Sequence, residues 1–248
     1  MVNSAELIIY GIASVLTSLF SSVAGGGGGF IITPLLIFLG LSPAQAVANG
    51  KFMGFSLAIS NVRVLRKQKL HSWSDIIPLI AISVVVGLIA ARFIVKIDGE
   101  VYQKMIGVLI LSMVPLVHFK KVGHSSRVVS RNRKAIGYVL TTGTLSMQAM
   151  FSSGLGTLVN LSLMSFGGMS AMEAGINRRY SQLFLNGVLI AGLWGSGLIV
   201  WSIVVVGILA NLVGGTIGAH MALKKGNAYV MTTLKVLMVC SGVALLLI

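Results

Sequence analysis

Long apolar segments separated by short polar stretches make up most of this chain. The clearest segments run from Ile76 to Ile94, where Arg92 is the one ionisable residue, and from Trp201 to Leu223, where His220 is the one ionisable residue. A helix needs ~20 mostly apolar residues to cross the hydrocarbon core of a bilayer. The pattern therefore predicts an all-α, polytopic membrane protein.

The expected helices form two series with the same order of parts. The first series has helices at Leu7–Ala24, Ala44–Val64, Ile76–Ile94 and Tyr102–Phe119, a glycine-rich break at Gly25–Gly29 and a short apolar segment at Phe30–Leu41. The second has helices at Ala135–Phe151, Ala171–Leu193, Trp201–Leu223 and Tyr229–Ile248, a break at Gly154–Gly156 and a short segment at Leu158–Phe166. A dozen helical residues span about 18 Å, well short of a ~30 Å core. We therefore expect eight full transmembrane helices and two short half-helices.

An internal duplication relates the two series. A shift of 128 positions brings Asn49 onto Asn177, and the same register holds without a gap from Gly26 to Lys96. The matched pairs include Gly26 and Gly154, Gly28 and Gly156, Lys51 and Arg179, Phe52 and Tyr180, Trp73 and Trp201, and Gly87 and Gly215. Chance matches in an apolar chain are mostly Leu or Gly, not Trp, Asn and basic–aromatic positions in one register. We expect a first repeat at 1–119, a linker at 120–134 and a second repeat at 135–248.

The positions of the charges indicate how the halves are oriented. The net charge is +14, with 56% hydrophobic and 10% charged residues, and the cations gather in loops between apolar segments. Basic residues are retained in cytoplasmic loops, so this placement favours a membrane protein over a nucleic-acid-binding one. The loop Arg63–Lys69 is basic while its counterpart Trp194–Val200 is uncharged. Equivalent loops are therefore expected on opposite sides of the membrane, in inverted halves; four crossings per half would instead make the halves parallel.

The glycine-rich breaks are the first candidate for a binding site. A break followed by a helix start presents unpaired N–H groups and the positive end of a helix dipole, which together attract an anion. The alternative is close helix packing through small residues. Membranes tolerate irregular backbone only where protein or a water-filled cavity surrounds it, which favours a functional break. The candidate substrate-binding glycines are Gly26, Gly27, Gly28, Gly154 and Gly156.

Basic residues inside apolar helices are the second candidate. Asn49 and Lys51 match Asn177 and Arg179 in the repeat register. A cation near the bilayer centre costs ~2.5–3.5 kcal/mol, so two at equivalent positions indicate a negatively charged ligand. Their side chains alternatively reach an interface or pair with a carboxylate. Because Arg178 points about 100° away from Arg179 on a helix, one of the two is expected to face the ligand, and the register favours Arg179.

Glu173 is a candidate for proton coupling, because the other four acidic residues lie at span ends or in loops. Alternatively, it caps its own helix. No metal site or cofactor is expected, since Cys240 is the single cysteine and no His-Glu-x-x-His motif occurs. The segment Trp194-Gly195-Ser196-Gly197 lacks the first glycine of a G-x-S-G motif. An enzyme is therefore not expected.

Several of these segments together resemble the sulfite exporter TauE/SafE family, over nearly the whole chain. The resemblance implies a membrane permease for small organic or sulfur-containing anions, such as sulfite or sulfoacetate-type compounds. The residues that carry it are Gly25–Gly29, Pro34-Leu35-Leu36, Ser42 to Lys51, Arg66–Lys69, Trp73-Ser74-Asp75, Gly154–Thr157 and Gly214–Ala219.

The expected function is secondary transport of a small anion across the cell (inner or plasma) membrane, because the chain has no ATP-binding motif and carries paired cations. Its expected partners are a small anionic substrate and membrane lipid, not nucleic acid, and a homo-oligomer is compatible with the pattern. Two other functions fit the same residues: an anion channel, and a membrane scaffold or accessory subunit.

The charge pattern predicts that the linker 120–134 faces the cytoplasm and, with inverted halves, that both termini lie outside. Single cysteines replacing Asn3, Ser125 or Asn227, with Cys240 changed to serine, test this by thiol labelling of intact cells. Only the cysteine at Asn3 should label from outside. External labelling at Ser125 would overturn the orientation, and external labelling at Asn227 would exclude inversion alone.

Overall fold

The computed structural model describes residues 3–24, 26, 28–68, 72–94, 130–151 and 155–246, and the regular elements there are all helices. They are α1 (Ser4–Ala24), α2 (Gly29–Phe38), α3 (Pro43–Leu65), the short 3₁₀ turn η1 (Arg66–Gln68), α4 (Trp73–Ile94), α6 (Arg131–Met150), α7 (Gly156–Gly167), α8 (Ala171–Leu193) and α9 (Trp201–Leu246). The all-α prediction is confirmed. Gly27, Gly154, the predicted helix Tyr102–Phe119 and linker residues 120–129 lie outside the described residues.

The two long helices that follow the short ones begin with the same local signal. Ser42 accepts a hydrogen bond from the backbone N–H of Gln45, whose side chain accepts one from the Ser42 N–H, and Pro43 opens the helix. Ser170 and Glu173 form the equivalent capping box at the start of α8. Such reciprocal caps satisfy N–H groups that a helix start leaves unpaired.

Three described helices are long and apolar enough to cross a membrane: α1, α4 and the Trp201–Gly226 part of α9. Gly226 has φ 76° and ψ −171°, so α9 consists of two helices that meet there, as the sequence predicts. Helices α3 and α8 contain 23 residues each but bury many polar side chains. The count of eight crossings remains a prediction.

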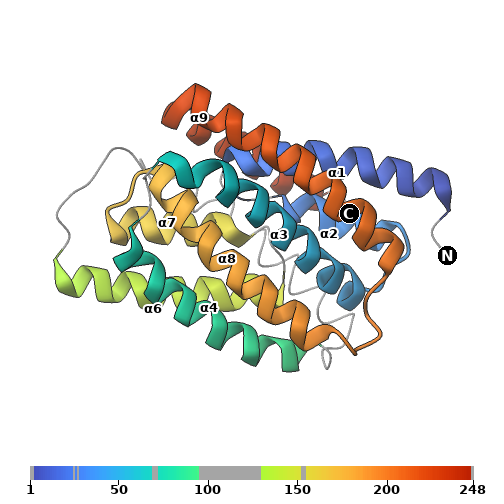
Figure 1. Ribbon diagram of the computed structural model, residues 1–248, viewed down its shortest axis with the longest axis horizontal. Helices are drawn as coiled ribbons and strands as arrows, with labels where there is room; N and C mark the ends of the chain where they lie inside the picture. The colour runs from blue at the N-terminus through green and yellow to red at the C-terminus, as the bar shows by residue number, and fades with distance from the viewer. Residues whose placement is uncertain are drawn as a thin grey trace.

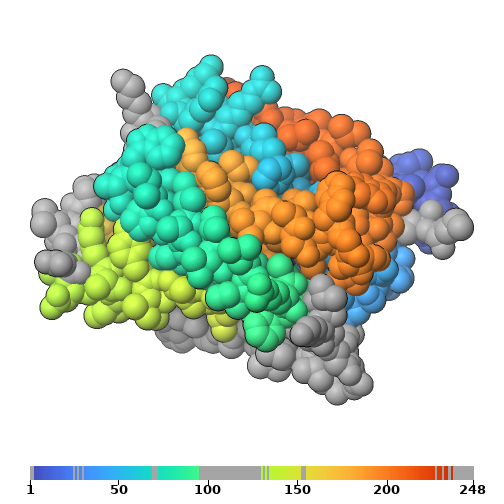
Figure 2. Space-filling model, turned by 60° about the horizontal axis from the view of Figure 1, so that its bottom comes forward, coloured from blue at the N-terminus to red at the C-terminus, as the bar shows by residue number. Residues whose placement is uncertain are grey.

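The helices of the two expected halves are interleaved. Helices α1 and α9 pack along each other, α3 and α8 lie in the middle, and α4 packs on α8 and α6 (Figure 1). Figure 2 shows the face where α4 and α6 lie side by side. Most of these contacts join an element of the first expected half to one of the second, so the described parts of the two halves share their core.

Glycines permit the closest helix crossings, and two of these crossings are reciprocal. A Cβ at Gly87 of α4 would lie 3.0 Å from Val188 of α8, and the equivalent Gly215 of α9 packs against Ser60 of α3. Ser60 and Val188 are themselves 128 positions apart. The same crossing is therefore made twice, each time between opposite halves.

The polarity of α1 is reversed compared with a helix at the surface of a water-soluble protein. On α1 the exposed side chains are large and apolar, and the buried face carries hydroxyl groups. The exposed residues are Ile8, Ile9, Ile12, Leu16 and Phe20, and the buried ones are Tyr10, Ser14, Thr17, Ser18, Ser21 and Ser22. Large apolar side chains on the outer surface suit a helix that is surrounded by lipid.

Gly218→Ala should destabilise the protein, because the new Cβ would lie 2.7 Å from the Ser22 Cβ and against the carbonyl of Leu19. Overpacking of this kind costs about 1–3 kcal/mol. Gly143→Ala is the matched control, since a Cβ there meets nothing within 4 Å; it should be neutral or stabilising by up to ~1 kcal/mol. Thermal unfolding in detergent measures both, and equal midpoints for the two variants would contradict the close crossing.

Candidate functional site

The two glycine-rich breaks meet inside the bundle. A Cβ at Gly26 would lie 3.1 Å from the backbone N of Thr157 and 3.2 Å from the carbonyl carbon of Gly156. Only a residue without a side chain lets these backbones approach so closely. The starts of α2 and α7, 128 positions apart in register, are thereby brought together.

A cavity of about 30 Å³ adjoins the first break. This is room for about two water molecules. Polar groups from α1, α8 and α9 line it together with the start of α2 and one side of α3. The lining residues are Thr17, Ser18, Ser21, Gly26, Gly28, Gly29, Ile32, Thr33, Val47, Gly50, Met53, Gly54, Leu57, Arg178, Gln182 and Asn211.

Arg178 supplies the positive charge of this cavity. Its side chain is 1% exposed, and its Nη1 donates a 2.8 Å hydrogen bond to Oε1 of Gln182, one turn further along α8. The guanidinium lies against Gly156 at the start of α7, where any side chain would displace it. The repeat register had singled out Arg179, whereas the cation that lines the cavity beside Gly26 and Gly28 is Arg178.

Lys51 and Arg179 make equivalent contacts with opposite halves. Nζ of Lys51 donates to the carbonyl of Gln148, 3.0 Å away near the end of α6. Nη2 of Arg179 donates to the carbonyl of Ser22, 2.7 Å away near the end of α1. The two side chains are 1% and 2% exposed, so neither reaches an interface.

These contacts have a common physical reason. The last four carbonyls of a helix lack intrahelical partners, and the C-terminal end carries a negative partial charge. A cation from the other half satisfies carbonyls there and interacts favourably with the dipole. The paired cations thus hold the ends of the two helices that precede the breaks.

The other predicted residues lie outside the cavity. Asn49 donates to the carbonyl of Leu198, 3.0 Å away, and accepts from the N–H of Val200, 2.9 Å away, which fixes the segment before α9. Nδ2 of Asn177 lies 3.3 Å from the sulfur of Met169. Glu173 belongs to the capping box described above. Coupling of Glu173 to protons remains a prediction.

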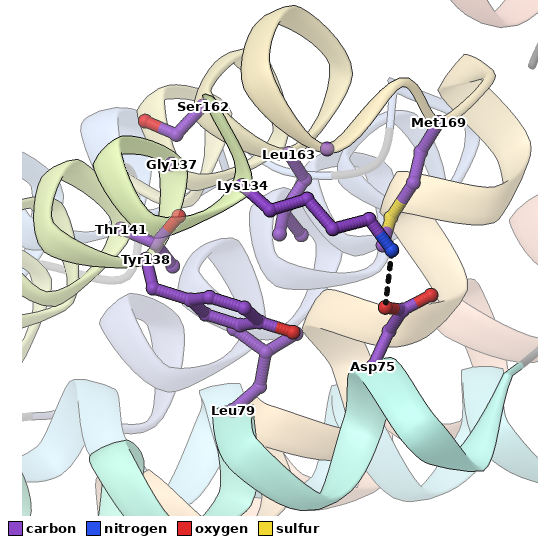
Figure 3. Close-up of a pocket in the computed structure, with 10 residues that line it drawn as sticks. Asp75, Leu79, Lys134, Gly137, Tyr138, Thr141, Ser162, Leu163 and Met169 are labelled. Atoms are coloured by element: carbon purple, nitrogen blue, oxygen red, sulfur yellow. Dashed lines mark ion pairs between the residues drawn. The ribbon is translucent and has the colours of Figure 1, made fainter. Parts of the chain in front are cut away.

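A separate cavity of about 20 Å³ lies between α4, α6 and α7 (Figure 3). Lys134 and Asp75 form an ion pair of 3.6 Å at its edge, and Tyr138, Thr141 and Ser162 are among its lining residues. The pair joins the first turns of α4 and α6. This contact is far along both helices from their ends at Ile94 and Met150, and it does not involve the glycine breaks.

Sequence reasoning missed the uncharged polar residues of the main cavity. Gln182 follows Arg178 by one helical turn, and Asn211 lies within an apolar span. Thr17, Ser18 and Ser21 recur at helical spacing on α1. Polar residues at a spacing of three or four inside an apolar helix were the available signal, because they fall on one face.

Comparisons with known proteins point to a family of membrane transporters. A sequence profile of the sulfite exporter TauE/SafE family matches residues 10–245. "Probable membrane transporter protein YfcA" of Escherichia coli strain K12 is 23% identical over 231 residues, which is 92% of this chain and 84% of that protein.

Two further relatives carry similar names. A "Probable membrane transporter protein" of Haemophilus influenzae is 22% identical over 85% of this chain and 83% of its own length. The "Probable membrane transporter protein ORF9" of a Sinorhizobium species is 20% identical over 95% of this chain and 90% of its own. No solved structure matches.

The reciprocal contacts predict that a substitution in one half changes hydrogen exchange in the other half. Lys51→Met should raise hydrogen–deuterium exchange in the last turn of α6, and Arg179→Met should raise it in the last turn of α1. Loss of a hydrogen bond from a charged donor, ~1.5–3 kcal/mol, corresponds to roughly 10- to 150-fold faster exchange. Lys224→Met on the exposed surface should change neither. Faster exchange confined to the substituted half would contradict the assignment.

Proposed function

The chain belongs to the sulfite exporter TauE/SafE family of membrane transporters, and we propose that it is a secondary transporter of a small anion. The substrate class is a sulfur-containing oxyanion or organosulfonate such as sulfite. The anion binds in the cavity between the first glycine break and Arg178. The main cation of the proposed site is therefore Arg178 and not its neighbour Arg179, which the repeat register had favoured.

The charge of the cavity is the observation that carries the proposal. Arg178 is buried in it, and no acidic residue of the described part of the chain is among the lining residues. The described acids, Glu6, Asp75 and Glu173, each lie in the first turn of a helix. A buried guanidinium favours an oxyanion, because planar N–H donors match its oxygens in geometry and charge.

The helix starts add to this preference. The N-cap residues of α2 and α7, Gly28 and Leu155, make no side-chain capping hydrogen bond. At the start of α2 the N–H of Gly28 donates to Oγ of Ser21 and that of Ile31 to the carbonyl of Gly28. The positive partial charge of the helix end, more than free N–H groups, therefore favours an anion there. Broken helices at equivalent places in two repeats are the usual pattern of substrate sites in secondary transporters. The hydroxyls of Thr17 and Ser21 on α1 supply further donors, whereas that of Ser18 donates to the carbonyl of Val15.

The reciprocal contacts support a two-fold relation between the halves, and the charges of equivalent loops favour its inverted form. Trp73 packs on Tyr180 at 5.6 Å between ring centroids, and the equivalent Trp201 packs on Phe52 at 6.0 Å. An exchange of halves therefore maps many contacts onto each other, as alternating access between two related repeats requires. In the proposed orientation, the basic linker 120–134 lies on the cytoplasmic side of the plasma membrane.

A channel and an accessory subunit are the competing functions. A channel needs a cationic lining but no alternating closure. Flux that saturates and shows counter-exchange in liposomes favours the transporter. A purified protein that moves no anion in liposomes favours the accessory subunit.

Arg178→Met should weaken sulfite binding by roughly 10- to 150-fold, because it removes a charge-assisted hydrogen bond of ~1.5–3 kcal/mol. Arg178→Lys should retain part of the affinity, since the charge remains but the planar donors are lost. The measurement is the thermal shift of detergent-purified protein with sulfite, together with labelled-sulfite counterflow in proteoliposomes.

Gly50→Leu tests the same cavity without altering a charge. Gly50 lines the cavity and has nothing within 4 Å of an added Cβ, so leucine should fill the space without distorting the helix. Binding and counterflow should both be lost. Gly143→Leu, on an exposed face, is the control and should behave as wild type. Wild-type sulfite affinity in both Arg178→Met and Gly50→Leu would refute the proposed site.

A further inference from the structure

Apart from the main cavity and the one between α4, α6 and α7, a further cavity of about 20 Å³, called the second cavity below, lies around Arg179. It exceeds the ~10–15 Å³ that one water molecule requires. Ser22, Leu65, Ala171, Gly175, Ala222 and Arg179 are among its lining residues. The main cavity does not share these residues. Apart from Ser22 and the guanidinium, the side chains named here are apolar.

Arg179 brings unused hydrogen-bond donors to this cavity. Its Nη2 is bound to the end of α1, but Nε and Nη1 are buried and have no hydrogen-bond partner among the described residues. The residue is 2% exposed. Buried N–H groups without acceptors cost free energy, and a buried cation costs more. A water molecule can accept these hydrogen bonds, whereas an oxyanion also balances the charge.

The two cavities lie on either side of the same two backbone segments. Ser21 and Arg178 line the main cavity, and the residues directly after them, Ser22 and Arg179, line the second. Since consecutive residues of a helix point about 100° apart, adjacent arginines can serve adjacent cavities. This geometry allows both Arg178 and Arg179 to contact an anion, each in its own cavity, although the sequence had led us to expect that one of the two faces the ligand.

The second cavity also lies near basic loops. Leu65, which lines it, directly precedes Arg66 and Lys67, and Ala222 is two residues before Lys224. A cavity close to several cations concentrates anions from solution. The main cavity is lined instead by residues in the interior of α3 and α9, such as Gly54 and Asn211.

We propose that Arg179 holds a second oxyanion of the substrate class in this cavity, so that the transported anion passes between the Arg178 and Arg179 cavities. The inference rests on the proposed function. Met172 lines the second cavity, and its flexible side chain can move to admit an anion of a few heavy atoms. Arg179 thus has two roles: it caps the end of α1, and it forms the second anion-binding site, called the second station below.

Gly175→Leu tests this station without removing the cap. Gly175 lines the second cavity one turn before Arg179, and nothing lies within 4 Å of an added Cβ. Equilibrium dialysis of the purified full chain against labelled sulfite, under nitrogen, should give two bound anions per wild-type chain. Gly175→Leu should bind one and lose counterflow, Gly50→Leu should also bind one, and the double variant should bind none. Gly143→Leu should bind two.

The possible results separate the two hypotheses. One sulfite per wild-type chain, unchanged in Gly175→Leu but lost in Gly50→Leu, would overturn the second station and leave the proposed function intact. No bound sulfite in any variant would count against both. Organic phosphorus that copurifies with wild type and disappears in Gly175→Leu would identify a lipid headgroup as the oxyanion and overturn the relay.

Discussion

The architecture depends on how buried cations are held inside a bundle whose outer surface is apolar. Lys51 and Arg179 are almost completely buried, and each donates to backbone carbonyls near the end of a helix from the other half. The carbonyls at a helix end lack intrahelical partners and carry a negative partial charge, so helix ends inside the protein are favourable acceptors for these cations. The breaks and the cations therefore stabilise each other: the cation satisfies carbonyls that the helix end leaves unpaired, and the helix end offers the cation an acceptor with a negative partial charge.

Each break has two ends of opposite polarity, and the protein uses them differently. The carbonyl ends of α1 and α6 are occupied by Arg179 and Lys51. The N–H ends, at the starts of α2 and α7, lie beside the main cavity and Arg178. Because the negative ends are already compensated, the remaining potential around the cavity is positive. In a region of low dielectric, such a potential acts strongly on an anion.

Local patterns were sufficient to predict the order of the described helices and the interruptions between α1 and α2 and between α6 and α7, because each depends on residues close in sequence. The capping boxes at Ser42 and Ser170 appear in both halves for that reason. The cavity into which each arginine side chain points could not be predicted from the sequence. Arg178 and Arg179 are both interior, and the choice between their cavities depends on α1, α3 and α9, which are distant in sequence. The register identified Arg179 correctly as the equivalent of Lys51, but equivalence in the repeat indicated a shared helix cap and not the cation of the main cavity.

The residue equivalent to Arg178 explains why the cavity is asymmetric. A shift of 128 positions places Gly50 at the Arg178 position, and both residues line the same cavity, one from α3 and one from α8. Two arginines there would fill the space and would repel each other where water cannot screen them. Two glycines would leave space without charge. One glycine and one arginine together provide room and a cation. For a binding site between two related halves, different residues at this pair of equivalent positions are therefore more favourable than identical ones, whereas the neighbouring Lys51 and Arg179 both remain cations.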